Sequence, residues 1–156
     1  MIEIAIPGRP TLRIASALID FNGTLAVDGQ LVVGVAERLR DLAARIEVQV
    51  VTGDTTGTAS QALRGLPVGV QLLPAEGQQA GKGRAIDAMH VSETAVIGNG
   101  CNDSAALEKA ALSIVVVGTE GCAIDALMRA HVACGSICDA LDLLLIPRRL
   151  VATLRR

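Results

Sequence analysis

The stretch from Ile14 to Leu25 reads Ile-Ala-Ser-Ala-Leu-Ile-Asp-Phe-Asn-Gly-Thr-Leu, and it decides the fold that we expect. An apolar run of strand length ends in Asp20, and a turn that contains Gly23 follows directly. In an open α/β sheet, residues just past the carboxyl end of a strand line the ligand crevice, which Asn22 would also reach. Gly23 lets the backbone turn sharply and approach a ligand closely. A carboxylate so placed can act as a nucleophile or a metal ligand, although such turns are also common without any function.

The composition predicts a single α/β domain over residues 1–156. The chain has 156 residues, of which 51% are apolar, with one Phe and no Trp or Tyr. A chain of this length can bury about 70% of the surface that its unfolded form exposes. Its core must therefore consist of Val, Leu, Ile and Ala packed between layers, as α/β proteins allow.

Charge and hydropathy exclude two classes of partner. The formal net charge is −2 with acids and bases interspersed, which gives no basic surface for nucleic acid. No stretch reaches the ~18 consecutive apolar residues that a membrane span needs, and Glu3, Pro7 and Arg9 interrupt any signal-peptide core. We therefore expect a cytoplasmic protein whose cysteines are reduced and lie in or near the core. These are Cys101, Cys122, Cys134 and Cys138.

Strands and helices are expected to alternate along the chain, which predicts a three-layer, doubly wound parallel sheet with helices on both faces. The expected strands are 2–6, 12–20, 48–52, 67–73, 94–97, 113–117 and 132–134. Helical spacing of apolar residues predicts helices at 34–46, 55–64, 84–90, 106–110, 124–129, 137–145 and 148–154. His90 and His131 have no partner at ligand spacing, so we interpret both as structural or surface residues.

Two hairpins are expected in the first part of the chain. Residues 2–20 would form a hairpin that extends the sheet. Asp28-Gly29 between two short apolar runs predicts a second hairpin, a small flap over the mouth of the crevice. Beyond it, Thr55 or Thr56 would cap a helix whose first N–H groups point at the crevice.

Polar residues at the predicted strand ends suggest one site. Asp20 and Asn22 follow the first long strand, Thr52 ends the next, Lys82 comes from a loop, and Asp103 follows a glycine-rich turn. An acid, a hydroxyl, a lysine and a second acid suit a phosphoryl group with Mg²⁺, which prefers a couple of carboxylates plus water and phosphate oxygens. Lys82 would offset the repulsion between Asp20 and phosphate, about 4 kcal/mol at 4 Å.

Four motifs resemble those of the haloacid dehalogenase (HAD) superfamily and stand in that family's order. They are Asp-Phe-Asn-Gly-Thr-Leu at 20–25, Val-Thr-Gly-Asp at 51–54, Gly-Lys-Gly at 81–83, and Gly-Asn-Gly-Cys-Asn-Asp at 98–103. Segments 52–59 and 102–110 are also similar to the phosphorylation domain of P-type ATPases and so to small, capless, soluble relatives of them. The resemblance implies a Rossmann-like core with a hairpin flap and no large cap.

The resemblance also implies a role for each residue at a motif position. Asp20 would be the nucleophile that forms an aspartyl-phosphate, with Asn22, Thr52 and Lys82 as further catalytic residues. The phosphate group would be held by Thr52, Gly53, Lys82 and Gly23. The Mg²⁺ ion would be held by Asp20, the backbone carbonyl of Asn22, Asn99 and Asp103.

Two residues depart from the family's pattern. The phosphatases carry an acid two positions after the nucleophile, where this chain has Asn22, and general acid–base help is typically worth 10²–10⁴-fold in rate. A metal-binding Asp usually stands where this chain has Asn99. We therefore expect a site that forms or holds a phosphoryl group but hydrolyses it slowly.

The leading hypothesis is a Mg²⁺-dependent phosphohydrolase that acts on a small phosphorylated metabolite. A phosphate- or metal-binding regulatory module and a partner of a P-type ATPase remain as alternatives, and dehalogenation ranks far lower. Asp54 would cap the next helix or reach the site, while Cys101 would be a spacer in its loop. Because the flap is the one cap-like element in the sequence, either the substrate is large or a neighbouring subunit covers the crevice. On that ground we also predict a homo-oligomer.

Overall fold

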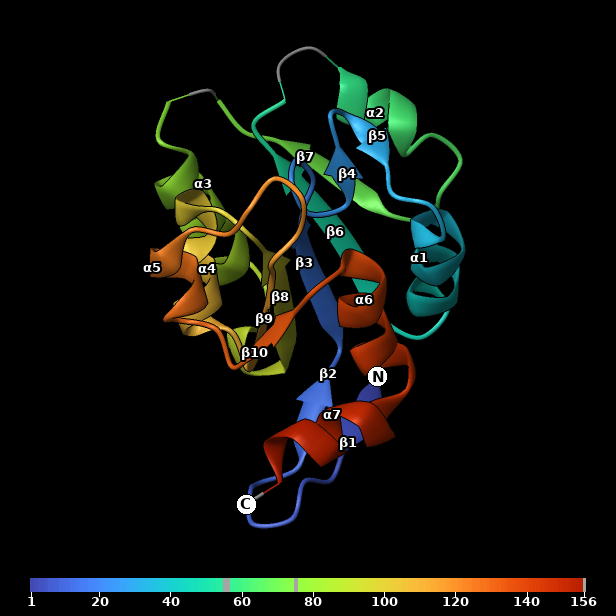
Figure 1. The fold of residues 1–156 in the computed structure, drawn as a ribbon, viewed down its shortest axis with the longest axis vertical. Helices are drawn as coiled ribbons and strands as arrows, with labels where there is room; N and C mark the ends of the chain where they lie inside the picture. The colour runs from blue at the N-terminus through green and yellow to red at the C-terminus, as the bar shows by residue number, and fades with distance from the viewer. Residues whose placement is uncertain (55–56, 75, 156) are drawn as a thin grey trace.

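A six-stranded parallel sheet forms the centre of the computed structural model, which describes residues 1–54, 57–74 and 76–155 (Figure 1). The strands are β3 (Ser16–Asp20), β6 (Glu47–Thr52), β7 (Gly69–Leu72), β8 (Thr94–Gly98), β9 (Leu112–Val116) and β10 (Val132–Cys134). Their order is β7-β6-β3-β8-β9-β10, and every neighbouring pair is parallel. This is the doubly wound order, which reverses beside β3 and places a ligand crevice there. The predicted fold class is confirmed.

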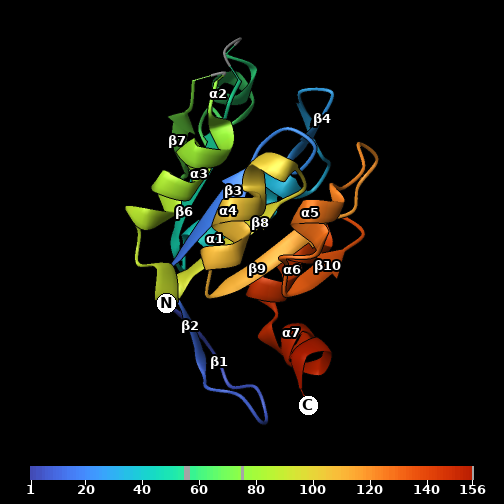
Figure 2. The ribbon, with the colours of Figure 1, turned by 90° about the vertical axis from the view of Figure 1, so that its left-hand side faces the viewer.

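Helices cover both faces of the sheet. On one face lie α1 (Val35–Ala43) and α6 (Ile137–Leu145). Helix α7 (Pro147–Leu154) packs against α6 at the end of the molecule where the parallel strands begin (Figure 1). Figure 2 shows the other face, covered by α3 (Gln78–Asp87), α4 (Ser104–Lys109) and α5 (Ile124–Leu127). The remaining helices are α2 (Thr58–Ala62) and the short 3₁₀ helices η1 (Val91–Glu93) and η2 (Cys101–Asp103).

The core consists of two layers separated by the sheet, both largely aliphatic, with the fully buried Phe21 and the buried Cys134 in one of them. Every residue of β3, β8 and β9 is buried, so these strands have apolar side chains on both faces. In β3, Ala17 and Ile19 pack toward α1 and α6, whereas Leu18 packs toward α3 and α4. Parallel strands buried on both faces are continuous apolar runs, which explains why they were recognisable in the sequence.

The first hairpin differs from the prediction. Its strands, β1 (Ile2–Ile4) and β2 (Leu12–Ile14), form a separate two-stranded sheet and do not extend the central one. The chain changes partners at Ala15, whose N–H donates to the carbonyl of Glu93 and whose carbonyl accepts from the N–H of Glu47. The hairpin consequently projects from the end of the molecule where the parallel strands begin (Figure 1).

The second hairpin is the predicted flap. Strands β4 (Ala26–Val27) and β5 (Gln30–Leu31) pair antiparallel around Asp28 and Gly29. Both turn residues have positive φ, at 50° and 76°, which is the backbone that a two-residue hairpin turn requires. The N–H of Asp28 also donates to the carboxylate of Glu120 at 3.0 Å, so the flap is tied to the loop after β9.

Lys82 lies on a helix and not in the predicted loop. Helix α3 begins at Gln78, although Gly81 and Gly83 lower the helical propensity of this segment. Close packing accounts for Gly81, because a Cβ there would lie 3.0 Å from a methyl group of Leu73. Gly81 therefore allows α3 to pack closely on Leu73, just after β7, while the helix carries the buried Lys82.

Helix α2 is shorter than the sequence indicated. It spans Thr58–Ala62 after Gly57, and the proposed caps Thr55 and Thr56 lie outside the described residues. The carboxylate of Asp54 accepts a hydrogen bond from the N–H of Ala59 at 2.6 Å, which agrees with the capping interpretation of Asp54.

The cysteines are only partly as predicted. Cys134 is buried and Cys122 and Cys138 are half-buried, but Cys101, the first residue of η2, is exposed. All four thiols are free, as expected. Across the three described ranges, each helix is too short or too polar to cross a membrane.

Candidate active site

The candidate site lies where β3 and β6 end. Asp20 is the last residue of β3 and Thr52 the last of β6, and the two strands are paired in parallel. Both residues are buried, with 7% and 1% of their surface exposed. The sheet itself therefore holds the carboxylate and the hydroxyl at the edge of the crevice.

Lys82 connects Asp20 with Asp103. Its ammonium group donates to Oδ1 of Asp20 at 2.5 Å and to Oδ1 of Asp103 at 2.6 Å. All three side chains are nearly inaccessible to solvent. Two carboxylates and one ammonium leave this buried triad with a net charge of −1, so an added cation would be attracted to it.

The glycine-rich turn holds Asp103 in place. Its Oδ2 accepts hydrogen bonds from the backbone N–H groups of Asn99 at 3.1 Å and Gly100 at 2.9 Å. A Cβ on Gly98 would lie 2.4 Å from the carboxyl carbon of Asp103, so only glycine fits at the end of β8. The turn thus fixes one oxygen of Asp103 and leaves the other facing Lys82.

Burial and charge shift the titration of the triad. Burial is the largest cause that raises the pKa of Asp20, and the carboxylate of Asp103 adds to it, so that the pKa rises to about 6 even though Lys82 opposes the shift. Burial would lower the pKa of Lys82, but the two carboxylates together outweigh it and raise the pKa. The ammonium therefore stays charged at neutral pH, and Asp20 is ionised above about pH 6.

A small polar cleft opens beside Asp20. It has a volume of about 130 Å³ and is lined by Asp20, Asn22, Thr52, Gly53, Gln78 and Asn102. Oγ1 of Thr52 accepts a hydrogen bond from the N–H of Asp54 at 3.2 Å. The hydroxyl hydrogen of Thr52 can then be donated to an anion in the cleft.

Two residues of the cleft were not identified from the sequence. Nδ2 of Asn102 donates to Oε1 of Gln78 at 3.0 Å, which joins the glycine-rich turn to the start of α3. The Gln78 amide also lies over Gly53, with its nitrogen 1.9 Å from where a Cβ of that glycine would be. Asn102 belongs to the fourth motif and could have been identified there, whereas Gln78 was hidden in a segment predicted as a loop.

Gly23 and Asn99 have structural partners that narrow their roles. The N–H of Gly23 donates to the carbonyl of Ala26 at 2.8 Å, so this glycine shapes the turn and does not offer its N–H to a ligand. Oδ1 of Asn99 accepts from the hydroxyl of Thr24 at 3.2 Å, and its Nδ2 donates to the carbonyl of Gly121 at 3.3 Å. Asn99 therefore ties the base of the flap to the loop after β9.

Comparison with curated proteins places the chain next to two uncharacterised proteins of Methanocaldococcus jannaschii, while no family model matches it. MJ0072 is 46% identical over 39 residues, which are 25% of this chain and 89% of MJ0072. The chain belongs to the MJ0072 family. MJ0073 is also 46% identical, over 59 residues that make up 38% of this chain, and the chain spans 63% of the length of MJ0073.

The fold of this member of the MJ0072 family is similar to that of several solved structures. The 3-deoxy-D-manno-octulosonate 8-phosphate phosphatase of Moraxella catarrhalis, in complex with magnesium, phosphate and KDO, superposes with a TM-score of 0.70 at 17% identity over 91% of this chain and 94% of that chain. The cobalt-bound enzyme of Haemophilus influenzae gives 0.71 at 14% identity over 92% and 94%. A protein of Legionella pneumophila assigned to the HAD superfamily hydrolases (subfamily III A) gives 0.73 at 15% identity over 91% and 87%. The fold is thus the HAD core without a large cap, whereas the likeness to P-type ATPases stays a prediction.

The donor set fits a hard cation that takes few protein ligands. Asp20 and Asp103 supply two carboxylates, and the described residues contain no group of three or more acidic, His or Cys side chains that could hold a metal ion. Mg²⁺ is commonly bound by one or two carboxylates, with waters and substrate phosphate in its other positions. In this chain of the MJ0072 family, the triad and the polar cleft beside it meet that requirement.

Proposed function

We propose that the chain is a Mg²⁺-dependent phosphohydrolase in which Asp20 is the nucleophile. The proposal depends above all on the buried contact of Lys82 with both Asp20 and Asp103, next to a polar cleft of about 130 Å³. A phosphate group brought to Asp20 would meet a carboxylate of the same sign. The Lys82 ammonium offsets that repulsion at a site where water does not screen the charges.

The reaction would proceed in two displacements. An oxygen of Asp20 attacks phosphorus, the bond from phosphorus to the leaving oxygen breaks, and an aspartyl-phosphate forms on Asp20. Water then attacks phosphorus, and the bond to the Asp20 oxygen breaks to release phosphate. Thr52 would donate its hydroxyl hydrogen to a phosphoryl oxygen, as would the backbone N–H of Gly53, while Lys82 balances the charge on Asp20.

The metal ligands proposed are Asp20, the backbone carbonyl of Asn22, and Asp103. Bound there, Mg²⁺ would neutralise phosphoryl oxygens and so reduce repulsion of the substrate. Asn99 as a further ligand stays a prediction. Its Oδ1 accepts one hydrogen bond, from Thr24, and would have a second lone pair for the ion.

Slow turnover follows from Asn22, which lines the cleft but can neither give nor take a proton as a carboxyl group does. We propose a small phosphorylated metabolite as substrate, since the cleft itself is small and polar. We also propose that residues 1–156 form one domain, that the protein is cytoplasmic, and that a neighbouring subunit of a homo-oligomer covers the cleft. Light scattering tests the oligomeric state.

The experiment is hydrolysis of p-nitrophenyl phosphate and acetyl phosphate with and without Mg²⁺. We expect wild-type protein to release phosphate only with Mg²⁺ and the Asp20→Asn variant to release none above background. An acid quench during turnover should trap a wild-type chain that carries a phosphoryl group. Hydroxylamine should remove that group, as expected of an acyl phosphate. Equal rates for wild type and Asp20→Asn would refute the proposal.

A second candidate is a phosphate-binding regulatory module, favoured by Asn22 and Asn99 at positions where an acid would aid turnover. Such a module would bind inorganic phosphate with Mg²⁺ in a calorimeter but give no Asp20-dependent hydrolysis. The two assays together separate the candidates.

A further inference from the structure

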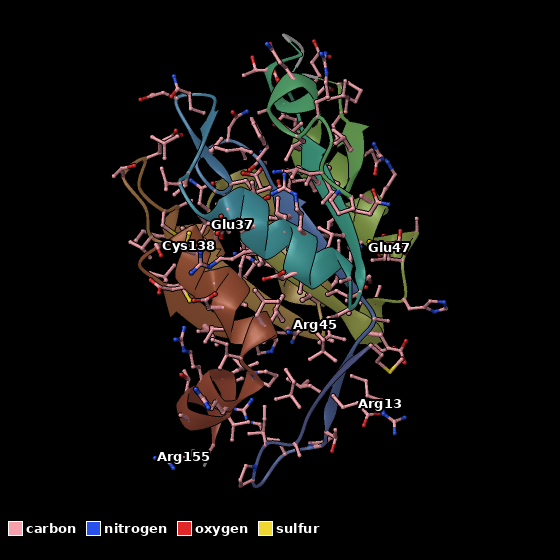
Figure 3. All side chains as sticks on the ribbon, turned by 90° about the vertical axis from the view of Figure 1, so that its right-hand side faces the viewer. Arg13, Glu37, Arg45, Glu47, Cys138 and Arg155 are labelled. Atoms are coloured by element: carbon pink, nitrogen blue, oxygen red, sulfur yellow. The ribbon has the colours of Figure 1, made fainter. Side chains whose placement is uncertain are left out.

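A second cavity lies at the end of the molecule opposite Asp20, between the first hairpin and α7. It has a volume of about 360 Å³ and is lined by residues 8–12 of the hairpin turn, residues 111–112 at the start of β9, His131 and Leu154. These segments lie where the parallel strands begin, whereas Asp20 lies where β3 ends. Figure 3 shows Arg155, which follows Leu154 in the sequence, at this same end of the molecule. The cavity shares no lining residue with the cleft at Asp20.

The floor of this cavity is aliphatic and its rim is polar. Leu112 and Leu154 are buried, with 1% and 8% of their surface exposed, and Leu12 is half-buried beside them. Arg9 and His131, in contrast, are exposed lining residues. The cavity therefore suits a molecule that has an apolar body and a polar group at one end.

Hydrogen bonds fix the imidazole of His131. Its Nδ1 accepts the backbone N–H of Ser113 at 3.0 Å and lies 2.8 Å from the Ser113 hydroxyl oxygen. In the neutral ring the proton must then reside on Nε2, which is directed away from Ser113. Partial desolvation of the imidazole against the aliphatic floor lowers the pKa of His131, and the nearby charge of Arg9 lowers it further. His131 therefore offers one N–H donor at a fixed position on the rim.

Arg9 supplies the positive charge. Its turn is closed by a hydrogen bond from its own N–H to the carbonyl of Ile6 at 3.0 Å, and Gly8 has the positive φ of 79° that the turn needs. Within the described ranges, Arg9 takes part in no ion pair. None of the residues that line the cavity is acidic. The guanidinium is thus available to an anion from outside the chain.

We propose that this cavity binds a small aliphatic carboxylate, with its carboxyl group between the Arg9 guanidinium and Nε2 of His131 and its hydrocarbon chain against Leu12, Leu112 and Leu154. One oxygen would accept from each donor, and because the acceptor is an ionised carboxylate both hydrogen bonds would be charge-assisted. Inorganic phosphate would gain the charge interaction but not the burial of an apolar chain. The cavity thus selects for a carboxylate that carries an aliphatic body.

The test is an NMR titration of the full chain with hexanoate, with hexanol and inorganic phosphate as matched probes. We expect saturable amide shifts at Ala111, Leu112 and Leu154 with hexanoate, and binding of each other probe about tenfold weaker or undetectable. The Arg9→Gln variant should weaken hexanoate binding by about tenfold. Arg64→Gln, an exposed arginine outside the cavity, should bind as wild type does.

A second variant guards against a misfolded hairpin. Ala111→Leu keeps Arg9 and His131 but fills part of the floor, and it should reduce hexanoate binding while the spectrum elsewhere stays folded. The absence of saturable shifts with hexanoate, or equal binding by wild type and Arg9→Gln, would overturn the proposal. So would a change of oligomeric state in Arg9→Gln without hexanoate binding in the wild type, because a second copy would then occupy the cavity. The readout is binding at a site remote from Asp20, so it does not depend on the proposed phosphohydrolase activity.

Discussion

Lys82 Nζ lies 2.5 Å from Oδ1 of Asp20, although the two residues are 62 positions apart in the chain. The contact depends on two separate features, the end of β3 that carries Asp20 and the glycine-containing helix α3 that carries Lys82. Asp103 completes the triad at 2.6 Å, so a single ammonium serves two buried carboxylates. Without a bound cation the site is therefore short of one positive charge, and its stability should respond to any change of charge.

The first prediction concerns the dependence of stability on pH without metal. The pKa of Asp20 is about 6 in the folded chain against an ordinary value of 3.8, so the folded state retains a proton that the unfolded state has lost between these values. The free energy of unfolding should therefore fall as pH rises from about 4 to about 6 and then level off, by on the order of 2–3 kcal/mol.

Asp20→Asn removes this charge and tests the prediction directly. In urea unfolding with EDTA, the variant should be more stable than wild type at pH 7.5, and the difference should shrink as the pH falls to 4. Asp41→Asn, which changes an exposed carboxylate on α1, serves as the control and should show no such trend. A difference between Asp20→Asn and wild type that stays constant from pH 4 to 8 would contradict the assignment of the shift to Asp20.

The second prediction concerns the loss of the ammonium. Lys82→Met would leave two buried carboxylates facing each other without a cation, and breaking such a buried pair typically costs about 3–5 kcal/mol. Lys109→Met is the matched control, because its ion pair with Asp87 at 2.7 Å is about half exposed and should contribute at most about 1 kcal/mol. Unfolding in urea at pH 7.5 compares the two variants.

Adding Asp20→Asn to Lys82→Met should recover part of the lost stability, since one of the two unpaired charges is then absent. Equal losses of stability in Lys82→Met and Lys109→Met would contradict the prediction, because the buried carboxylates would then not depend on the ammonium of Lys82.

The sequence was sufficient for the sheet and for the residues at its strand ends. Buried parallel strands are apolar throughout, and the polar residue that ends each one stands out, as Asp20 and Thr52 do. Lys82 was identified but placed in a loop, because Gly81 and Gly83 weaken the helical pattern. Tertiary packing against Leu73 accounts for Gly81, and no spacing in the sequence would indicate that contact.

Other features depend on contacts between distant segments. The first hairpin was expected to join the central sheet. Instead, its pairing ends at Ile14, and from Ala15 onward the backbone bonds to Glu93 and Glu47 beside the central strands. Gln78 reaches the cleft through its contact with Asn102, 24 positions away, and no spacing rule would indicate it. The cavity beside Arg9 likewise depends on distant segments, because residues 8–12 and Leu154 line it together.

The third prediction concerns Gly53. A methyl group there would lie 1.9 Å from the present position of the Gln78 amide nitrogen, so Gly53→Ala must displace that side chain from the cleft. Because a long side chain can move, we expect little loss of stability but weaker binding of inorganic phosphate with Mg²⁺, by about tenfold. Calorimetry measures the affinity, and Gly135→Ala, where a Cβ meets nothing within 4 Å, is the control.

A double variant separates the two residues. If the Gln78 amide contributes to phosphate binding, Gly53→Ala combined with Gln78→Ala should bind no more weakly than Gln78→Ala alone. A further tenfold loss in the double variant would show instead that the methyl group blocks the cleft itself.

The fourth prediction concerns the missing proton donor. Asn22 lines the cleft two residues after Asp20, and Asn22→Asp would place a carboxyl group where the leaving oxygen and the attacking water must exchange protons. Hydrolysis should rise by about 10²-fold, the lower end of the range for general acid–base catalysis. The gain should be larger for an alkyl phosphate than for p-nitrophenyl phosphate, because the poorer leaving group depends more on protonation.

Asn102→Asp adds the same charge to the same cleft from another position and should not reproduce this preference. A uniform gain in both variants, without regard to the leaving group, would mean that added charge attracts more Mg²⁺ and that the proton relay is not what limits the wild-type chain.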